Sequence, residues 1–218
     1  MLIQQGRVTV DGTCAKLGDR IDPGMMRVAI DGVMLPLDTG LVTWLVYKPP
    51  GVVATMDDPY GRPIVTDLVP PEPVTKPVGR LDVHSEGLML LTNDGDLALR
   101  VTHPRFGIEK VYRILTTSAV SKQHLAAMVA GVDLDDGHAR MMRARVVTTQ
   151  GNRSMVEVVM TEGRKREIRR IFEVLGIGIE RLVRTSIAGI SDGSLAPGSY
   201  RALSVTEIRS IYEKASRQ

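Results

Sequence analysis

Hydrophobic and polar residues alternate over short stretches near the N-terminus. Residues 6–12, GRVTVDG, and residues 26–30 have the two-residue period of a strand, and an Asp-Gly pair lies at the end of each. Asp-Gly is a strong signal for the tight turn of a β-hairpin. We therefore expect a small β-rich segment at the N-terminus, too short to hold a robust core by itself.

The following residues continue with strand patterns. Residues 41–47 form a predicted strand that the sequence Lys-Pro-Pro-Gly stops, and residues 88–91 are a continuous apolar run. Six prolines between residues 55 and 77 predict a long irregular segment, a kind of loop that often carries function. Further strands are predicted over residues 110–115, 141–148 and 155–160.

Helical periodicity is clearest over residues 164–175. One apolar stripe is formed there by Ile168, Ile171, Phe172 and Leu175, and Gly176 follows as a stop signal. Other helices are predicted over residues 96–102, 121–130 and 206–215.

Composition narrows the class of protein. The 218 residues are 43% apolar and 24% charged with a formal net charge of +3, which suits one large domain or a medium domain with a small appendage. No apolar run reaches the ~18 residues of a membrane span, and no secretory signal is present, so a cytoplasmic protein is expected. The single cysteine, Cys14, cannot form an intrachain disulfide and is expected to be buried. Four histidines without cysteine partners predict no metal site.

The candidate chemistry lies in residues 79–95, GRLDVHSEGLMLLTNDG. Asp82 follows Arg80 by two residues, in a polar segment that leads into the apolar run. An acid beside a cation at the mouth of a core strand suits catalysis, although a turn aspartate more often caps a backbone amide. The only close acid is Glu86, and glycosidases need a carboxylate pair, so a metal-free hydrolase is the weaker alternative.

The predicted helix from residue 164 is strongly basic. Its first seven residues, 164–170, hold five cations and one acid, Glu167; the cations are Arg164, Lys165, Arg166, Arg169 and Arg170. At 100° per residue, Arg169 lies at the border of the apolar stripe, while Arg170 points away from the core. A border arginine can lean into a cleft and stay charged. A basic run is also often a solvated surface, and charge alone leaves both interpretations open.

Four blocks, in order along the chain, resemble a known family. They are similar to motifs of the pseudouridine synthases that modify ribosomal RNA, in the branch of small-subunit synthase A and large-subunit synthases B, E and F. The blocks are residues 48–70 (KPPGVVATMDDPYGRPIVTDLVP), 79–95, 102–114 (THPRFGIEKVYRI) and 162–176 (EGRKREIRRIFEVLG). The first block is most similar to that of synthase B. Residues 1–35 resemble the latter half of an S4 RNA-binding domain, without its usual first helices.

The resemblance implies an α+β fold with a mostly antiparallel central sheet, flanking helices and a central RNA-binding cleft. Residues 1–38 would form a partial S4-like RNA-binding segment with a linker, and residues 39–218 the catalytic domain. The expected reaction converts a uridine of ribosomal RNA to pseudouridine. The similarity to synthase B favours large-subunit (23S) RNA as the substrate. Small-subunit ribosomal RNA is an alternative, as is a non-catalytic RNA-binding or ribosome-assembly protein.

The expected partner is ribosomal RNA or a pre-ribosomal particle, with the chain acting as a monomer and without a membrane. Because substrate and product contain the same atoms, the resemblance implies no cofactor, no nucleotide and no metal. Asp82 would be the catalytic aspartate, which either attacks C1′ of the ribose or removes its 2′ proton to give a glycal. The sequence leaves both routes open.

The resemblance also implies roles for the residues around Asp82. Tyr112 would stack under the base and help to move the C5 proton, and Arg169 would keep Asp82 ionised. Ile168 would line the pocket, and Arg80 would fill the gap left by an extruded uridine. Phosphate contacts are expected from Lys48, Arg164, Arg166 and Arg170. Glu167 replaces a glutamine that is common in the family, and its charge is expected to weaken one RNA contact.

Overall fold

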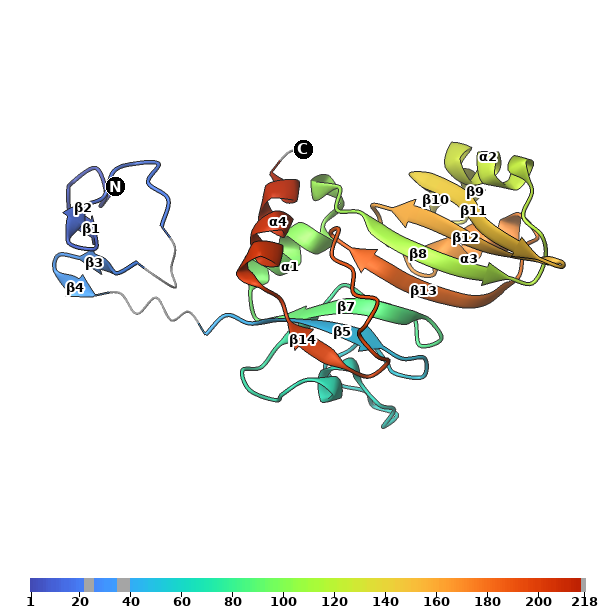
Figure 1. Cartoon of the computed structure of the whole chain (residues 1–218), viewed down its shortest axis with the longest axis horizontal. Coiled ribbons are helices and arrows are strands. Elements are labelled where there is room, and N and C mark those ends of the chain that lie inside the picture. The colour runs from blue at the N-terminus through green and yellow to red at the C-terminus, as the bar shows by residue number, and fades with distance from the viewer. Residues whose placement is uncertain (22–25, 35–39, 217–218) are drawn as a thin grey trace. The chain divides into compact units, whose positions relative to one another are not determined.

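Two structural units make up the chain, Met1–Leu41 and Val42–Gln218. They are seen in a computed structural model that describes residues 1–21, 26–34 and 40–216 (Figure 1). The strand predicted over residues 26–30 begins next to residues outside the described ranges, and residues 35–39, most of the predicted linker, lie outside them. Each unit has its own β-sheet, and the sheets are described separately.

Two antiparallel hairpins form the sheet of the first unit. The strands β1 (Val8–Val10), β2 (Thr13–Cys14), β3 (Val28–Ile30) and β4 (Val33–Met34) lie in the order β2-β1-β3-β4. Both hairpins turn at an Asp-Gly pair whose two residues have positive φ, as a type I′ turn requires. The hairpin predictions are confirmed. The prediction of a buried Cys14 is wrong, because both residues of the short edge strand β2 are exposed.

An eight-stranded sheet is the centre of the second unit (Figure 1). The strand order is β11-β12-β8-β13-β7-β5-β14, and β6 pairs with β7. All these pairs are antiparallel except that of β13 with β7, so the expected mostly antiparallel sheet is confirmed. The strands are β5 (Thr43–Lys48), β6 (Lys76–Val78), β7 (Glu86–Thr92), β8 (Lys110–Thr116), β11 (Arg143–Gln150), β12 (Arg153–Met160), β13 (Ile179–Ile187) and β14 (Tyr200–Ala202).

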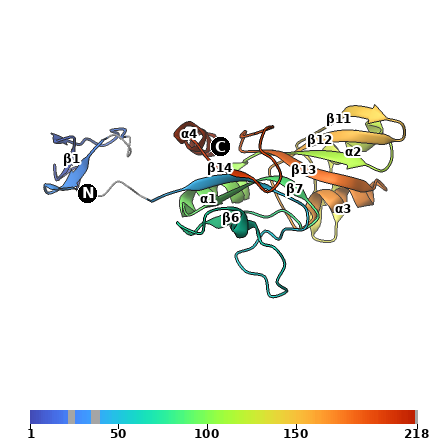
Figure 2. The same ribbon diagram turned by 60° about the horizontal axis from the view of Figure 1, so that its bottom comes forward.

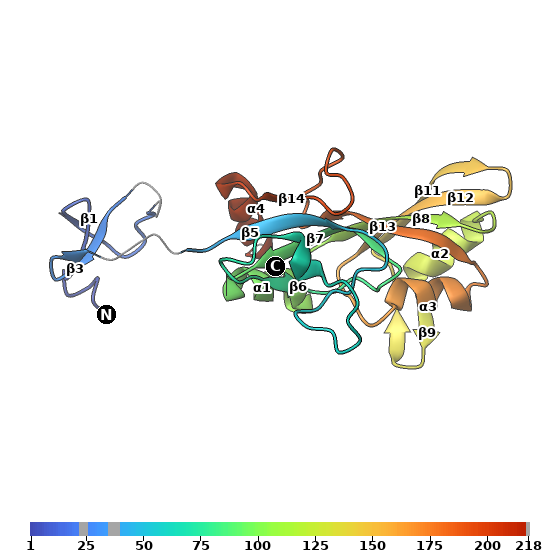
Figure 3. The ribbon, with the colours of Figure 1, turned by 90° about the horizontal axis from the view of Figure 1, so that it is seen from below.

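Burial along the strands explains the hydrophobic patterns. β7 is buried at all seven positions, because one apolar core packs on each of its faces. One core includes α2 (Lys122–Ala130) and α3 (Glu167–Val174), which lie along the same side of the sheet (Figure 3). The other core includes α1 (Gly95–Thr102) and α4 (Val205–Ala215). Where β8 has only one covered face, its burial alternates from residue to residue.

Several elements differ from the predictions. The basic helix begins at Glu167 rather than at residue 164, because Arg166 has a left-handed backbone conformation with φ of 52° that no α-helix contains. The nine-residue strand β13 was not predicted, nor were the short strands β6, β9 (Val132–Leu134), β10 (Gly137–Ala139) and β14. Strands of three residues are too short for a periodic signal.

The proline-rich segment between β5 and β6 is irregular, as predicted, and part of it projects from the sheet (Figure 2). It contains one turn of 3₁₀ helix, Val65–Leu68. Its first residues are tied to the loop before β7, because the Gly51 amide donates a hydrogen bond of 2.8 Å to the carbonyl of Val83. In the part of the chain that the structure describes, no helix has the length and apolar character needed to cross a membrane.

Candidate active site

One pocket of about 70 Å³ brings together seven of the nine predicted site residues. They come from the loop before β7, from β8, from the segment before α3 and from α3 itself. The seven residues are Arg80, Asp82, Tyr112, Arg164, Arg166, Ile168 and Arg169. Lys48 and Arg170 do not line the pocket.

The loop formed by residues 79–85 carries Asp82. It connects β6 to β7, and the amide of Ser85 closes it by donating to the carbonyl of Asp82 at 2.9 Å. The Asp82 side chain is 26% exposed, which leaves the carboxylate open to a ligand in the pocket.

The Lys48 ammonium contacts this loop at the carbonyl of Val83. The ammonium is fully buried and donates to the carbonyls of Val52 at 2.8 Å and Pro49 at 3.0 Å, with a longer contact of 3.5 Å to that of Val83. Burial lowers the pKa of Lys48 to about 8, although the negative charges of Asp82 and Glu86 oppose the shift. The predicted phosphate contact of Lys48 is therefore wrong, because an enclosed ammonium cannot reach an RNA backbone.

Arg169 is the cation next to the carboxylate. Its Nε atom lies 3.8 Å from Oδ2 of Asp82, and its Nη2 atom donates to Ser85 Oγ at 3.3 Å and to the carbonyl of His84 at 3.4 Å. Burial and the like charge of Arg166 lower the pKa of Arg169, but a guanidinium starts so high that it stays charged. The loop that carries Asp82 thus also orients its cation.

Tyr112 and Ile168 give the pocket its apolar surface. Tyr112 is 8% exposed on β8, where it pairs in register with Arg184 of β13 and Val158 of β12. Ile168 is equally buried in the first turn of α3. An aromatic ring, an aliphatic side chain and an ion pair therefore meet in one cavity, a combination that suits a planar ring joined to a sugar.

Arg80 and Arg166 are the exposed arginines of the pocket. Within the described ranges, neither side chain has a hydrogen bond or an ion pair. Both guanidinium groups are therefore available to a ligand.

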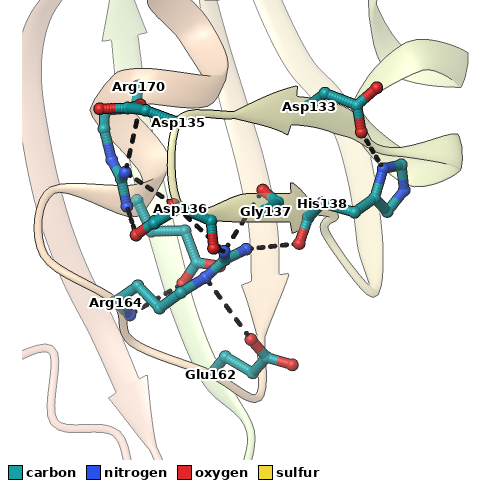
Figure 4. Close-up of polar contacts among 9 residues, drawn as sticks. Asp133, Asp135, Asp136, Gly137, His138, Glu162, Arg164 and Arg170 are labelled. Atoms are coloured by element: carbon teal, nitrogen blue, oxygen red, sulfur yellow. Dashed lines mark hydrogen bonds and ion pairs between the residues drawn. The ribbon is translucent and has the colours of Figure 1, made fainter.

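Arg164 and Arg170 bind partners within the protein (Figure 4). Both point at the turn between β9 and β10, where the Asp136 carboxylate pairs with Arg170 at 2.8 and 2.9 Å and with Arg164 at 3.3 Å. Arg164 also donates to the carbonyl of His138 at 2.7 Å. Hydrogen bonding to Arg170 lowers the pKa of Asp136 and keeps it ionised. Arg170 was expected to point away from the core and to contact phosphate, but the unpredicted hairpin covers it and pairs its guanidinium with Asp136.

Glu167 is also paired inside the protein, and its effect on RNA binding stays a prediction. It is 4% exposed and accepts hydrogen bonds from the backbone amide of Arg164 at 3.0 Å and from its Nε atom at 3.1 Å. The carboxylate therefore neutralises Arg164 at the start of α3, where a negative charge also suits the helix dipole.

Glu86 is committed to other residues. Its carboxylate accepts from Arg181 at 2.7 and 3.0 Å and from the Tyr47 hydroxyl at 3.0 Å, and the bond from Arg181 lowers the pKa of Glu86. It does not line the pocket of Asp82. A carboxylate held ionised in this way is unsuited to be the general acid of a glycosidase, so the geometry disfavours the hydrolase alternative.

Some residues near the pocket were not predicted. Ser85, which orients Arg169, and Glu162 line it, and Lys110 and Arg184 lie beside Tyr112 in an adjoining cavity. The position of Lys110 near the pocket could have been predicted, since it precedes Tyr112 by two residues and so lies on the same face of the strand. The position of Arg184 could not have been predicted, because its strand was not.

Comparisons with known proteins show what this chain is similar to. Residues 42–174 match the family model described as RNA pseudouridylate synthase. A Mycobacterium tuberculosis (strain H37Rv) protein named as an uncharacterized RNA pseudouridine synthase is 42% identical over 217 residues, 97% of this chain and 85% of that protein. The ribosomal large subunit pseudouridine synthase B of Escherichia coli O157:H7 is 38% identical over 197 residues, 87% of this chain and 68% of its own length. A solved structure of a pseudouridylate synthase has a TM-score of 0.70 at 28% identity, covering 96% of this chain and 90% of that one.

Proposed function

This chain belongs to the RNA pseudouridylate synthase family, and from that premise we propose that it isomerises a uridine of large-subunit ribosomal RNA with Asp82 as the catalytic carboxylate. That it is an RNA pseudouridine synthase follows from its family and its relatives. The large-subunit substrate is supported by its similarity to synthases named for that RNA.

The observation that carries the role of Asp82 is its place in the pocket. A partly exposed carboxylate lies 3.8 Å from a guanidinium and shares a cavity with Tyr112. The guanidinium of Arg169 places a positive charge beside the carboxylate that would act as nucleophile or base.

The reaction begins at the ribose of the bound uridine. Asp82 either attacks C1′ or removes the 2′ proton, and the bond from C1′ to N1 breaks with its electron pair going to the base. The base then rotates, and C5 bonds to C1′ as the Asp82–C1′ bond breaks or, on the glycal route, as the proton returns to C2′. The proton on C5 is then lost while N1 gains one. Tyr112 would stack against the base during rotation and assist the transfer of the C5 proton. Ile168 would restrict the pocket to a planar ring.

Two exposed arginines have separate roles in binding RNA. Arg80 precedes Asp82 in the same loop, so it can fill the space left when the uridine leaves its stack, a step that costs a few kcal/mol. Arg166 would contact phosphate at the mouth of the pocket. Since Lys48, Arg164 and Arg170 are held by internal partners, fewer phosphates are contacted by this motif than the sequence predicts.

The N-terminal unit would be a second RNA-binding part of the chain. We assign residues 1–38 as a partial S4-like RNA-binding segment attached to a catalytic domain of residues 39–218, an assignment that rests on sequence resemblance. We expect ribosomal RNA or a pre-ribosomal particle as the partner, in the cytoplasm.

The experiment that tests the proposed function maps pseudouridine in ribosomal RNA. Cells that lack the gene are compared with cells that carry it and with cells that carry only the Asp82→Asn variant. We expect one or more large-subunit positions to lose pseudouridine in the first and third strains. Loss at a small-subunit position would instead assign the alternative substrate, and unchanged maps would contradict catalysis on ribosomal RNA.

A further inference from the structure

Two buried cations lie beside Tyr112 without a carboxylate partner. Lys110 is 8% exposed and Arg184 is 3% exposed. Neither side chain forms an ion pair with any residue in the described ranges. Burying a charge without a partner costs free energy, and proteins usually pair such charges. The retention of two unpaired cations in one place therefore indicates a ligand that carries negative charge.

Strand pairing places the two cations next to the proposed stacking residue. Lys110 and Tyr112 are two residues apart on β8, so their side chains share one face of the sheet. Arg184 of β13 is the register partner of Tyr112. All three line a cavity of about 320 Å³, which adjoins the pocket of Asp82 because Arg80 and Tyr112 line both.

Both cations have N–H donors without a hydrogen-bond acceptor in the described residues. Arg184 Nε donates to the carbonyl of Leu88 at 2.6 Å, but its buried Nη2 atom has no hydrogen-bond partner. Lys110 Nζ donates to the carbonyl of Thr161 at 3.1 Å, one of the three bonds that an ammonium can form. A buried donor without an acceptor is destabilising, so a ligand with carbonyl oxygens would find partners here.

Apart from the charged side chains of Arg80, Glu162 and Arg164, the remaining lining of the cavity suits a base better than a hydrated phosphate. Val78, Val101 and Ile187 provide apolar walls, and Tyr112 provides an aromatic one. A planar ring with polar edges can pack on such walls while its carbonyl oxygens meet the cations.

The proposed reaction generates such a ligand. When the bond from C1′ to N1 breaks, its electron pair stays with the base, whether Asp82 attacks C1′ or removes the 2′ proton. The detached uracil is then an anion whose charge spreads over N1, O2 and O4. The charge disappears when C5 bonds to C1′ and the C5 proton is transferred. Fixed cations placed where charge develops are an effective form of catalysis.

We infer that Lys110 and Arg184 form a cationic site for the detached uracil and stabilise its negative charge while the base rotates. The inference rests on the proposed function and extends it, because it assigns catalytic contacts to two residues outside the pocket of Asp82. The cavity would also give the base room to turn without leaving the protein.

The test compares Lys110→Met with Lys110→Arg, and uses Lys122→Met on the exposed start of α2 as a matched control. Unmodified large-subunit ribosomal RNA transcript, tritiated at C5 of uridine, is mixed with excess enzyme, and release of tritium gives the rate of the chemical step. A separate binding titration gives the dissociation constant of the RNA.

Lys110→Met is expected to slow the chemical step by roughly 10²- to 10³-fold, the usual cost of losing one group that stabilises developing charge. Its dissociation constant should stay within about threefold of wild type. Lys110→Arg, which keeps the charge, should recover at least part of the rate, and it guards against a folding defect in the methionine variant. Lys122→Met should behave as wild type.

Two results would overturn the inference. An unchanged rate in Lys110→Met would show that the charge is not needed, and a loss of RNA affinity with an unchanged chemical step would make the site a phosphate contact. Absence of tritium release from wild type would instead refute the proposed function itself, and this outcome is recognised before any variant is measured.

The pH profile gives a second readout. Burial and the like charge of Arg184 lower the pKa of Lys110 to about 8, while Glu167 opposes the shift. The cavity also receives Glu162, Arg164 and Arg80. Since the protonated form is needed, kcat/KM of wild type should fall as pH rises through about 8, and in Lys110→Arg the fall should move to higher pH. A fall that stays in place would assign the titration to Lys48 and contradict the role of Lys110.

Discussion

The two sides of helix α3 use arginine in opposite ways. On one side, Arg166 and Arg169 face the pocket, where Arg166 has no partner in the described chain and Arg169 lies 3.8 Å from Asp82. On the other side, Arg170 is bound to Asp136 of the β9–β10 turn, and Arg164, just before the helix, shares that carboxylate (Figure 4). Within one run of basic residues, two arginines therefore face the pocket and two join the helix to a hairpin.

A basic motif therefore gives the number of cations that a helix carries, but not the number that are available to bind a ligand. The β9–β10 hairpin supplies acidic side chains to one side of the helix only. It holds α3 in place, and α3 in turn presents Arg169 to Asp82. The structural side of the helix therefore supports the catalytic side.

The largest expected effect lies at the centre of the pocket side. Asp82→Asn keeps the shape of the side chain but removes the charge that attacks or deprotonates the ribose. We expect pseudouridine formation to fall by roughly 10⁴-fold or more, with RNA affinity nearly unchanged. Tritium release and a binding titration on the same RNA measure both quantities. Substantial turnover by Asp82→Asn would remove the assignment on which the comparison depends.

The sharpest test of the comparison is a pair of neighbouring variants, Arg169→Ala and Arg170→Ala. The first removes the cation beside Asp82 and should lower the rate by roughly 10²-fold, far more than it weakens RNA binding. The second removes the partner of Asp136 and should lower the melting temperature while the rate changes much less. Rate measurements and thermal unfolding of both proteins decide the matter.

Equal loss of rate and binding in Arg169→Ala would count against an ion pair with Asp82. A loss of rate in Arg170→Ala as large as that in Arg169→Ala, in a folded protein, would show that the two sides of the helix are not separate.

The sequence predicted the pocket side of this comparison better than the other side. The roles of Tyr112, Ile168 and Arg169 come from family motifs, and helix periodicity added only that Arg169 borders the apolar stripe. All three line the pocket with Asp82. The burial of the two strands explains why the apolar run over residues 88–91 is continuous, since β7 is covered on two faces, whereas β8 is covered on one face and its burial alternates.

The structural side was missed for physical reasons. The β9–β10 hairpin consists of two three-residue strands, which are too short for a periodic signal, so the partner of Arg164 and Arg170 was invisible. Lys48 was predicted to bind phosphate because nothing local shows that the chain folds three carbonyls around its ammonium. Both errors concern long-range contacts of a charged side chain, which the local pattern does not encode.

A smaller effect separates Arg166 from the internally paired arginines. If Arg166 contacts one phosphate, Arg166→Ala should reduce the slope of log affinity against log salt by about 0.7, the value for one contact on single-stranded RNA. Arg170→Ala should leave this slope unchanged, because its guanidinium already has an anionic partner. Titrations at several salt concentrations measure the difference. Equal slopes for wild type and Arg166→Ala would contradict a phosphate contact at Arg166.

The smallest expected effect comes from removing metal ions. The carboxylate of Asp136 is occupied by two arginines, and the reaction needs no oxidant or reductant, so chelation should leave the rate of tritium release unchanged in a buffer where monovalent salt keeps the RNA folded. The same treatment should leave the melting temperature unchanged, since arginines and not a cation join the hairpin to α3. Activity that disappears with chelator and returns with one specific metal would contradict both statements. It would mean that the acidic turn or the pocket binds a cation, and that the division of α3 into a catalytic and a structural side is not set by arginine pairing alone.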